Sequence, residues 1–195
     1  MKKALLLLAD GFETFEASVF IDVIGWNLVY GDNSTELFTC GLRKEVKSSF
    51  NQRFIVDYRI DEIDIEFYDA LAIPGGFEVY GFYKDAYDNT FSDLIRAFKS
   101  NNKIIASICV GALPVGKSGI LNGKNGTVYN SPIRREELKG FGVNVIHQPI
   151  VVDDNIITSW NPSTAIDVAL LLLEKLTTKI NADKIRKLMG FEVKD

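Results

Sequence analysis

The stretch Lys103-Ile-Ile-Ala-Ser-Ile-Cys-Val-Gly-Ala112 decides the fold. An apolar, β-branched run reaches a single cysteine, Cys109, and stops at Gly111, after which Ala112-Leu-Pro-Val-Gly116 can begin a helix. A strand that turns sharply into a helix lifts a nucleophile clear of the sheet and aims free N–H groups at it, which would favour the thiolate. A lone cysteine that ends an apolar strand is also a common buried small side chain, so both interpretations stay open here.

Strands and helices alternate on both sides of this stretch. We expect further strands at 3–8, 36–40, 69–73, 127–129, 143–146, 149–152 and 156–159, and helices at 13–27, 90–101, 132–139, 165–176 and 181–189. A polar hairpin or an edge excursion is expected at 46–58 and an aromatic loop over the site at 77–89. This order predicts a doubly wound α/β fold, a mostly parallel sheet sandwiched by helices, as one domain over residues 1–195.

Three loops converge at the carboxyl ends of the strands, where ligands bind in such sheets. They are Asp10–Glu16, Pro74–Phe77 and Cys109–Gly111. The glycines of Pro74-Gly75-Gly76 form either a plain turn or exposed N–H groups for an anion. Glu13 and Glu16 share a helix face; Glu13 either complements the helix dipole or faces the site, whereas Glu16 has apolar neighbours and should lie near the end of the first strand.

Composition excludes several classes of function. With 22 basic and 26 acidic residues the net charge is -4, and no basic stripe is present, so we expect no nucleic-acid partner. The N-terminal apolar run is too short for a signal peptide and no segment approaches a membrane span, so we expect no membrane association. Cys40 and Cys109 match no zinc spacing and the chain has one histidine, so we expect no metal, no cofactor and free thiols in a reducing cytoplasm.

Four motifs in this order resemble the ThiJ/PfpI family, also called the DJ-one superfamily, and within it the DJ-one-like branch. They are Ala9-Asp-Gly-Phe-Glu-Thr-Phe-Glu16, Pro74-Gly-Gly76, Ala106-Ser-Ile-Cys-Val-Gly111 and Thr158-Ser-Trp-Asn-Pro162. The resemblance implies a flavodoxin-like fold, similar to class I glutamine amidotransferases, usually assembled as a homodimer.

The resemblance also assigns roles to individual residues. It implies that Cys109 is reactive and that a protonated Glu16 hydrogen-bonds its sulfur. It places an oxyanion pocket at the backbone N–H groups of Gly75, Gly76, Cys109 and Val110, which agrees with the chemistry of exposed amides.

Two departures from the family pattern matter. Many members carry a histidine after the cysteine, where this chain has Val110, and the nearby histidine of the DJ-one branch aligns with Tyr129. We interpret Tyr129 as an auxiliary hydrogen-bond donor or a core residue, and His147 as a structural residue in a strand. Without a histidine to protonate an amine leaving group, peptide hydrolysis is disfavoured. Trp160 stands where relatives carry a basic residue, which weakens any preference for anionic substrates.

The sequence therefore predicts a cysteine-dependent enzyme of the glyoxalase III or deglycase type, acting on a small carbonyl substrate. Cys109 would add to a 2-oxoaldehyde and Glu16 would move a proton between the two carbons, giving a 2-hydroxy acid. The alternative is a redox-sensing, stress-protective protein that uses oxidation of Cys109. An amidase or intracellular protease is the least favoured possibility.

Overall fold

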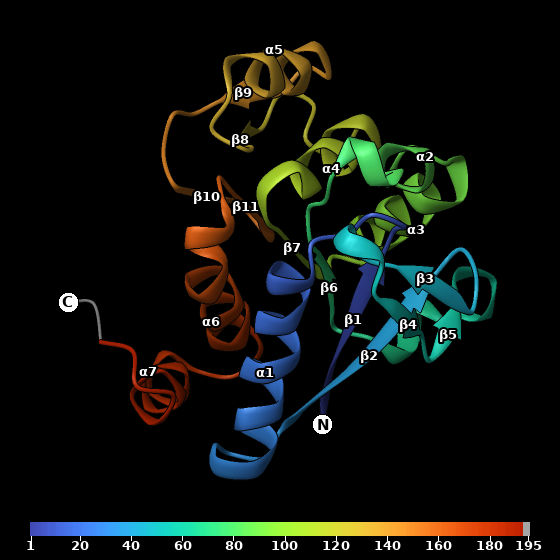
Figure 1. Ribbon diagram of the computed structural model, residues 1–195. Coiled ribbons are helices and arrows are strands. Elements are labelled where there is room, and N and C mark those ends of the chain that lie inside the picture. The colour runs from blue at the N-terminus through green and yellow to red at the C-terminus, as the bar shows by residue number, and fades with distance from the viewer. Residues whose placement is uncertain (193–195) are drawn as a thin grey trace.

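The centre of the protein is a seven-stranded sheet, whose strands lie behind and beside α1 in Figure 1. The computed structural model describes residues 1–192. The strand order is β10-β11-β7-β6-β1-β2-β5, and every neighbouring pair is parallel except the β10–β11 hairpin. The strands are β1 (Lys2–Leu8), β2 (Thr35–Gly41), β5 (Tyr58–Arg59), β6 (Ala70–Ile73), β7 (Ile104–Ser107), β10 (Ile150–Asp153) and β11 (Ile156–Ser159). The expected doubly wound, mostly parallel α/β fold is confirmed.

Helices cover both faces of this sheet, which explains why the central strands are almost continuously apolar. In Figure 1, α1 (Thr14–Tyr30) lies beside α6 (Ala165–Leu176), with α7 (Lys179–Leu188) next to them. The opposite face carries α3 (Asn89–Ser100) and α4 (Ala112–Lys117). Helix α3 turns a stripe of apolar side chains into the core: Phe91, Leu94, Ile95 and Phe98 are all buried. No helix within residues 1–192 has the length and apolarity to cross a membrane.

The smaller elements differ in part from the expectations. The hairpin expected at 46–58 is present as β3 (Glu45–Lys47) paired antiparallel with β4 (Arg53–Ile55). The loop expected at 77–89 contains a helical turn, Glu78–Tyr80, and the helix α2 (Phe82–Ala86). A helix of five residues is too short to show a period in the sequence. Its end residues Phe82 and Ala86 lie one helical turn apart, on the same face of α2, and both are buried.

The strand expected at 127–129 is wrong. The chain instead forms two-residue strands, β8 (Asn125–Gly126) and β9 (Asn144–Val145), which pair in parallel below α5 (Pro132–Gly140). The Thr127 N–H donates instead to the side-chain hydroxyl of Thr158 in β11 at 2.9 Å, so a hydroxyl takes the place of a ladder partner. His147 also lies outside any strand, in the exposed connection after β9.

Three neighbouring strands position the candidate site. β7, β6 and β1 are consecutive in the sheet and parallel, so their carboxyl ends open at one edge. The loops after β1 and β6 are joined to each other: the Glu13 N–H donates to Gly75 O at 2.8 Å and the Phe77 N–H to Gly11 O at 2.9 Å. The converging loops predicted from the strand order therefore form one continuous surface.

Candidate active site

Cys109 sits at a strained turn between β7 and α4. Its φ of 59° lies in the left-handed region that a residue with a side chain seldom adopts. Backbone hydrogen bonds hold this turn, from Ile108 N–H to Ile73 O at 3.1 Å and from Gly111 N–H to Ile108 O at 2.8 Å. A Cβ on Gly111 would lie 2.7 Å from Ile73 O, so only glycine fits after the elbow. This is the geometry expected of a presented nucleophile.

Glu16, in the first turn of α1, lies beneath this turn. Its side chain is fully buried, and Oε2 accepts a hydrogen bond from the Gly75 N–H at 2.7 Å. Its other oxygen, Oε1, is buried without a hydrogen-bond partner of good geometry among the described residues. The Glu16 carboxyl and the Cys109 thiol interact with each other. The two residues that the motifs single out are thus neighbours in space.

Burial controls the protons of this pair. Desolvation, reinforced by the nearby charge of Glu13, raises the pKa of Glu16 to about 8, against an opposing hydrogen bond from Gly75. Desolvation also raises the pKa of the Cys109 thiol, and a Glu16 carboxylate raises it further, although the Val110 N–H opposes this by donating to the sulfur. Burial therefore opposes the thiolate that the helix N-terminus was expected to favour, and a protonated Glu16 opposes it less than a Glu16 carboxylate does.

Gly75 and Gly76 are glycines because the site leaves no room for a side chain. A Cβ on Gly75 would lie 2.9 Å from Glu16 Oε2 and 3.0 Å from the Cβ of Cys109. A Cβ on Gly76 would lie 2.3 Å from Gly11 O. The Gly75 N–H, expected in an oxyanion pocket, is occupied by the Glu16 carboxyl. Its observed role is to fix that carboxyl against the cysteine.

A pocket of about 440 Å³ opens above Cys109. Of the residues predicted for the site, Glu13, Gly76, Cys109, Val110 and Tyr129 line it, while the buried Glu16 and Gly75 lie behind the wall. Tyr129 is 39% exposed and is therefore a residue of the pocket rather than of the core. The other lining residues were not singled out individually from the sequence: Phe77, Glu78, Val79 and Tyr83 belong to the loop expected over the site, Asn161 and Pro162 to the fourth motif, and Arg134 to neither.

Arg134 is the most consequential of the missed residues, because it brings a positive charge into the pocket. It comes from α5, and its guanidinium pairs with Glu78 at 2.9 Å and Glu137 at 2.8 Å and lies 4.8 Å from the ring centre of Tyr83. Its neighbours in sequence, Pro132-Ile-Arg-Arg135, read as an ordinary polar helix start. No signal in the sequence separates Arg134 from the adjacent Arg135.

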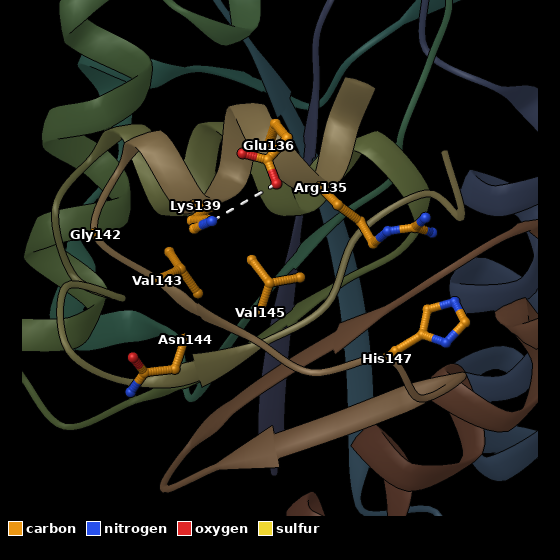
Figure 2. A pocket seen from close by; sticks show the side chains of 8 residues that line it. All are labelled: Arg135, Glu136, Lys139, Gly142, Val143, Asn144, Val145 and His147. Carbon is orange, nitrogen blue, oxygen red and sulfur yellow. Dashed lines mark ion pairs between the residues drawn. The ribbon is translucent and has the colours of Figure 1, made fainter. Parts of the chain in front are cut away.

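The single histidine lies at a different hollow. This second hollow, of about 670 Å³, lies between α5 and β9; Figure 2 shows Arg135, Lys139 and His147 around it. The ring centre of His147 is 4.9 Å from that of Trp160, and its Nε2 is 3.2 Å from Asn130 Oδ1. His147 thus lies outside the expected strand and is exposed, and it does not line the pocket of Cys109. Within residues 1–192 no cluster of histidine, cysteine and carboxylate side chains is placed to hold a metal ion.

Comparison with known proteins identifies the family. The profile of the DJ-1/PfpI family matches residues 2–175 of this chain. The chain belongs to the DJ-1/PfpI family. Protein dj-1beta of Drosophila melanogaster is 28% identical over 188 residues, with 95% of each chain covered. Its crystal structure superposes with a TM-score of 0.85 over 98% of this chain and 99% of that one, at 26% identity.

Two other members of the DJ-1/PfpI family carry functional words in their names. The structure of "Toxoplasma gondii DJ-1, oxidized" matches with a TM-score of 0.82 at 26% identity, covering 99% of this chain and 100% of that one. "Putative cysteine protease YraA" of Bacillus subtilis is 30% identical over 164 residues, 83% of this chain and 90% of that one. These names describe an oxidised state and a protease class for those two proteins.

Proposed function

We propose that this DJ-1/PfpI protein is a cysteine-dependent enzyme of the glyoxalase III or deglycase type, converting 2-oxoaldehydes to 2-hydroxy acids without a cofactor. The observation that carries the proposal is the buried Glu16–Cys109 pair at the base of an open pocket. A nucleophile and a carboxyl that exchange one proton are what an internal proton transfer between two adjacent carbons needs.

The steps follow the protons of the pair. With the proton on Glu16, the Cys109 thiolate adds to the aldehyde carbon, and Glu16 protonates the resulting alkoxide to give a hemithioacetal. The Glu16 carboxylate then removes the proton from this carbon and returns it to the neighbouring carbonyl carbon, while the hemithioacetal hydroxyl proton passes to the former ketone oxygen, leaving a 2-hydroxy thioester. Water hydrolyses the thioester, releasing the 2-hydroxy acid and the thiol. The Val110 N–H, which donates to the sulfur, stabilises the thiolate in the first step.

The test is incubation with methylglyoxal in the absence of glutathione, followed by an assay for lactate. We expect lactate from the wild type and none from Cys109→Ser, because serine is a far weaker nucleophile. Glu16→Gln should also lose turnover, because an amide cannot carry a proton between carbons. The matched control is Cys40→Ser: Cys40 is the other free thiol and is fully buried in β2. Substantial lactate formation by Cys109→Ser would refute the mechanism.

The second candidate function is redox sensing through oxidation of Cys109. It is supported by the same hydrogen-bond donors, since the Val110 N–H and a protonated Glu16 would stabilise a sulfinate as well as a thiolate. The Toxoplasma gondii relative, whose name describes an oxidised protein, is consistent with it. An intact enzyme that forms no lactate, but whose Cys109 oxidises selectively, would favour this function.

An amidase or protease has the weakest support, despite the name of the Bacillus subtilis relative. Its acyl-transfer step needs a group that protonates an amine as it leaves. The only histidine of the chain, His147, lies at the second hollow. Addition to an aldehyde expels no amine and makes no such demand.

We also propose that the protein is a homodimer in a reducing cytoplasm. Two free cysteines fit such a compartment. Ile21, Gly25 and Leu28 follow one another at helical spacing on α1 and line an apolar hollow of about 300 Å³ with Leu37 and Phe38 of β2. Ile21 and Leu28 are exposed, and nothing lies within 4 Å of a Cβ built on Gly25, so the same helix of a second copy can approach closely there.

A further inference from the structure

The Arg134 guanidinium holds two carboxylates of different character at the wall of the Cys109 pocket. Glu137 lies on the same helix, is 26% exposed and also accepts a hydrogen bond from the Tyr87 hydroxyl. Glu78 comes from the opposite rim, and its side chain is 70% exposed. The Arg134 side chain is only 24% exposed, and its guanidinium lies over the ring of Tyr83. One carboxylate is built into the wall, and the other rests at the pocket mouth.

We propose that Arg134 binds the carboxylate of a small aldehyde or ketone in the Cys109 pocket, and that Glu78 occupies this place when the pocket is empty. Because this inference names the substrate class of the proposed enzyme, it rests on the proposed function. The carbonyl group would face Cys109 and the carboxylate would face α5.

Charge balance favours exchange at this position. Arg134 and Glu137 neutralise each other, so Glu78 adds one negative charge at the guanidinium. A ligand carboxylate that replaces Glu78 leaves the number of charges unchanged. An ion pair whose carboxylate is this exposed is weak, so a better-buried carboxylate can displace it.

The chemistry of the ligand is a carboxylate rather than a dianion. Arg134 Nη2 already donates to a carboxylate oxygen of Glu78 at 2.9 Å, so the place accommodates that group. A phosphate would bring a second negative charge with no additional cation among the residues that line the pocket. Glu13, half-buried at the other wall, has its pKa raised by desolvation, which reduces its repulsion of an incoming carboxylate.

The experiment measures how well aldehydes protect Cys109 from alkylation by iodoacetamide. An aldehyde protects by reversible addition: the sulfur bonds to the carbonyl carbon and the thiol proton passes to the oxygen. Two matched pairs serve as probes, glyoxylate with acetaldehyde and succinic semialdehyde with butanal. Each pair differs by one carboxylate, and none of the four has the aldehyde and ketone side by side that turnover requires. Half-protecting concentrations are read from the intact mass in a Cys40→Ser background.

Arg134→Gln should raise the half-protecting concentration of at least one carboxylate aldehyde by about threefold or more, and leave its neutral partner unchanged. Glu78→Gln should lower the half-protecting concentration of the carboxylate aldehyde, because this variant lacks the competing carboxylate. The control variants are Arg135→Gln and Glu136→Gln, which remove the same charges at the second hollow (Figure 2) and should have no effect. Unchanged protection by the neutral aldehydes shows that the pocket is intact in each variant.

The result that overturns the proposal is equal protection of Arg134→Gln and Arg135→Gln by both carboxylate aldehydes. Arg134 would then only join α5 to the turn Glu78–Tyr80. Because the assay needs no turnover, it separates this inference from the proposed function. Carboxylate-selective protection without lactate formation would sustain the binding site and reject the glyoxalase.

Discussion

Glu16 and Gly75 are joined by a 2.7 Å hydrogen bond from the Gly75 N–H to Oε2, although 59 positions separate them in the chain. The bond fixes Oε2 to the loop after β6, whereas Oε1 is buried without a hydrogen-bond partner of good geometry among the described residues. A carboxyl held by one oxygen keeps its orientation beside the Cys109 thiol, with which it interacts.

The first prediction concerns stability as a function of pH. The pKa of Glu16 is raised to about 8 in the folded protein, so the folded state keeps a proton that the unfolded state releases above its ordinary value of 4.5. The contribution of this proton to the free energy of unfolding is fully present below pH 4.5 and is lost as the pH rises towards 8. Glu16→Gln, which keeps a neutral side chain, should therefore gain stability relative to wild type over this range, by up to about 1.4 kcal/mol per pH unit.

Urea unfolding at pH 5, 6.5 and 8 measures this effect. Glu136→Gln is the matched control, because Glu136 is 74% exposed on α5. Parallel stability curves for wild type and Glu16→Gln would mean that the buried carboxyl is ionised throughout.

The second prediction tests the fit around Gly75. Gly75→Ala should abolish most of the turnover, since its methyl group would lie 2.9 Å from Glu16 Oε2, 3.0 Å from the Cβ of Cys109 and 3.0 Å from Val110 N. We expect a loss of roughly 1–3 kcal/mol of unfolding free energy from this overpacking. Gly140→Ala is the control, because no atom lies within 4 Å of a Cβ at that position. An active Gly75→Ala variant would show that the Glu16–Cys109 spacing is not critical.

The sequence predicted most of the fold and half of the site, for physical reasons that can be stated. A buried parallel strand is apolar on both faces, so β1, β6 and β7 stand out as continuous runs. Their adjacency in the sheet brings the loops that carry Glu16, Gly75 and Cys109 to one edge. Helix α6 was predicted with its observed bounds, 165–176, because a long apolar run begins after a proline-containing turn.

The other half of the site depends on packing that no local pattern encodes. Arg134 reaches the pocket because α5 lies against the aromatic residues Tyr83 and Tyr87, a contact between segments about fifty residues apart. The acceptor for the Gly75 N–H also depends on the tertiary structure, because an exposed glycine amide can donate to an anion or to a side chain equally well. His147 was misplaced because Val143–Ile146 suggests a longer strand than the two residues that pair.

The third prediction concerns the ion pair that supports the loop after β1. The Asp85 carboxylate is 3% exposed and accepts from both terminal nitrogens of Arg43, at 2.6 and 2.8 Å, and from the Asp10 N–H at 2.8 Å. Arg43→Met leaves a buried charge without its cation and should cost roughly 2–3 kcal/mol of unfolding free energy. Arg53→Met, which removes an exposed pair with Glu45, should cost less than about 1 kcal/mol. Similar losses for the two variants in urea would contradict the structural importance of Asp85.

The fourth prediction distinguishes the two thiols. Mild peroxide should oxidise Cys109 before Cys40, because Cys109 lines the open pocket whereas Cys40 is fully buried in β2. Intact mass after a timed exposure should show the gain of oxygen in the wild type and in Cys40→Ser, but not in Cys109→Ser. Equal oxidation of both thiols would remove the support for redox sensing.

The last prediction concerns the assembly. A chain of 21.8 kDa that pairs through α1 should elute and scatter light as a particle of twice that mass. Ile21→Glu places a charge in the apolar hollow between α1 and β2, so it should shift the protein to the monomer. Ile180→Glu is the control, since Ile180 is 84% exposed on α7, away from that hollow. A wild type that stays monomeric at high concentration, or an Ile21→Glu variant that stays dimeric, would place the contact elsewhere or exclude it. If the monomer forms and retains lactate production, each pocket is complete within one chain, as the lining residues from the loop before α1, from α5 and from the elbow indicate.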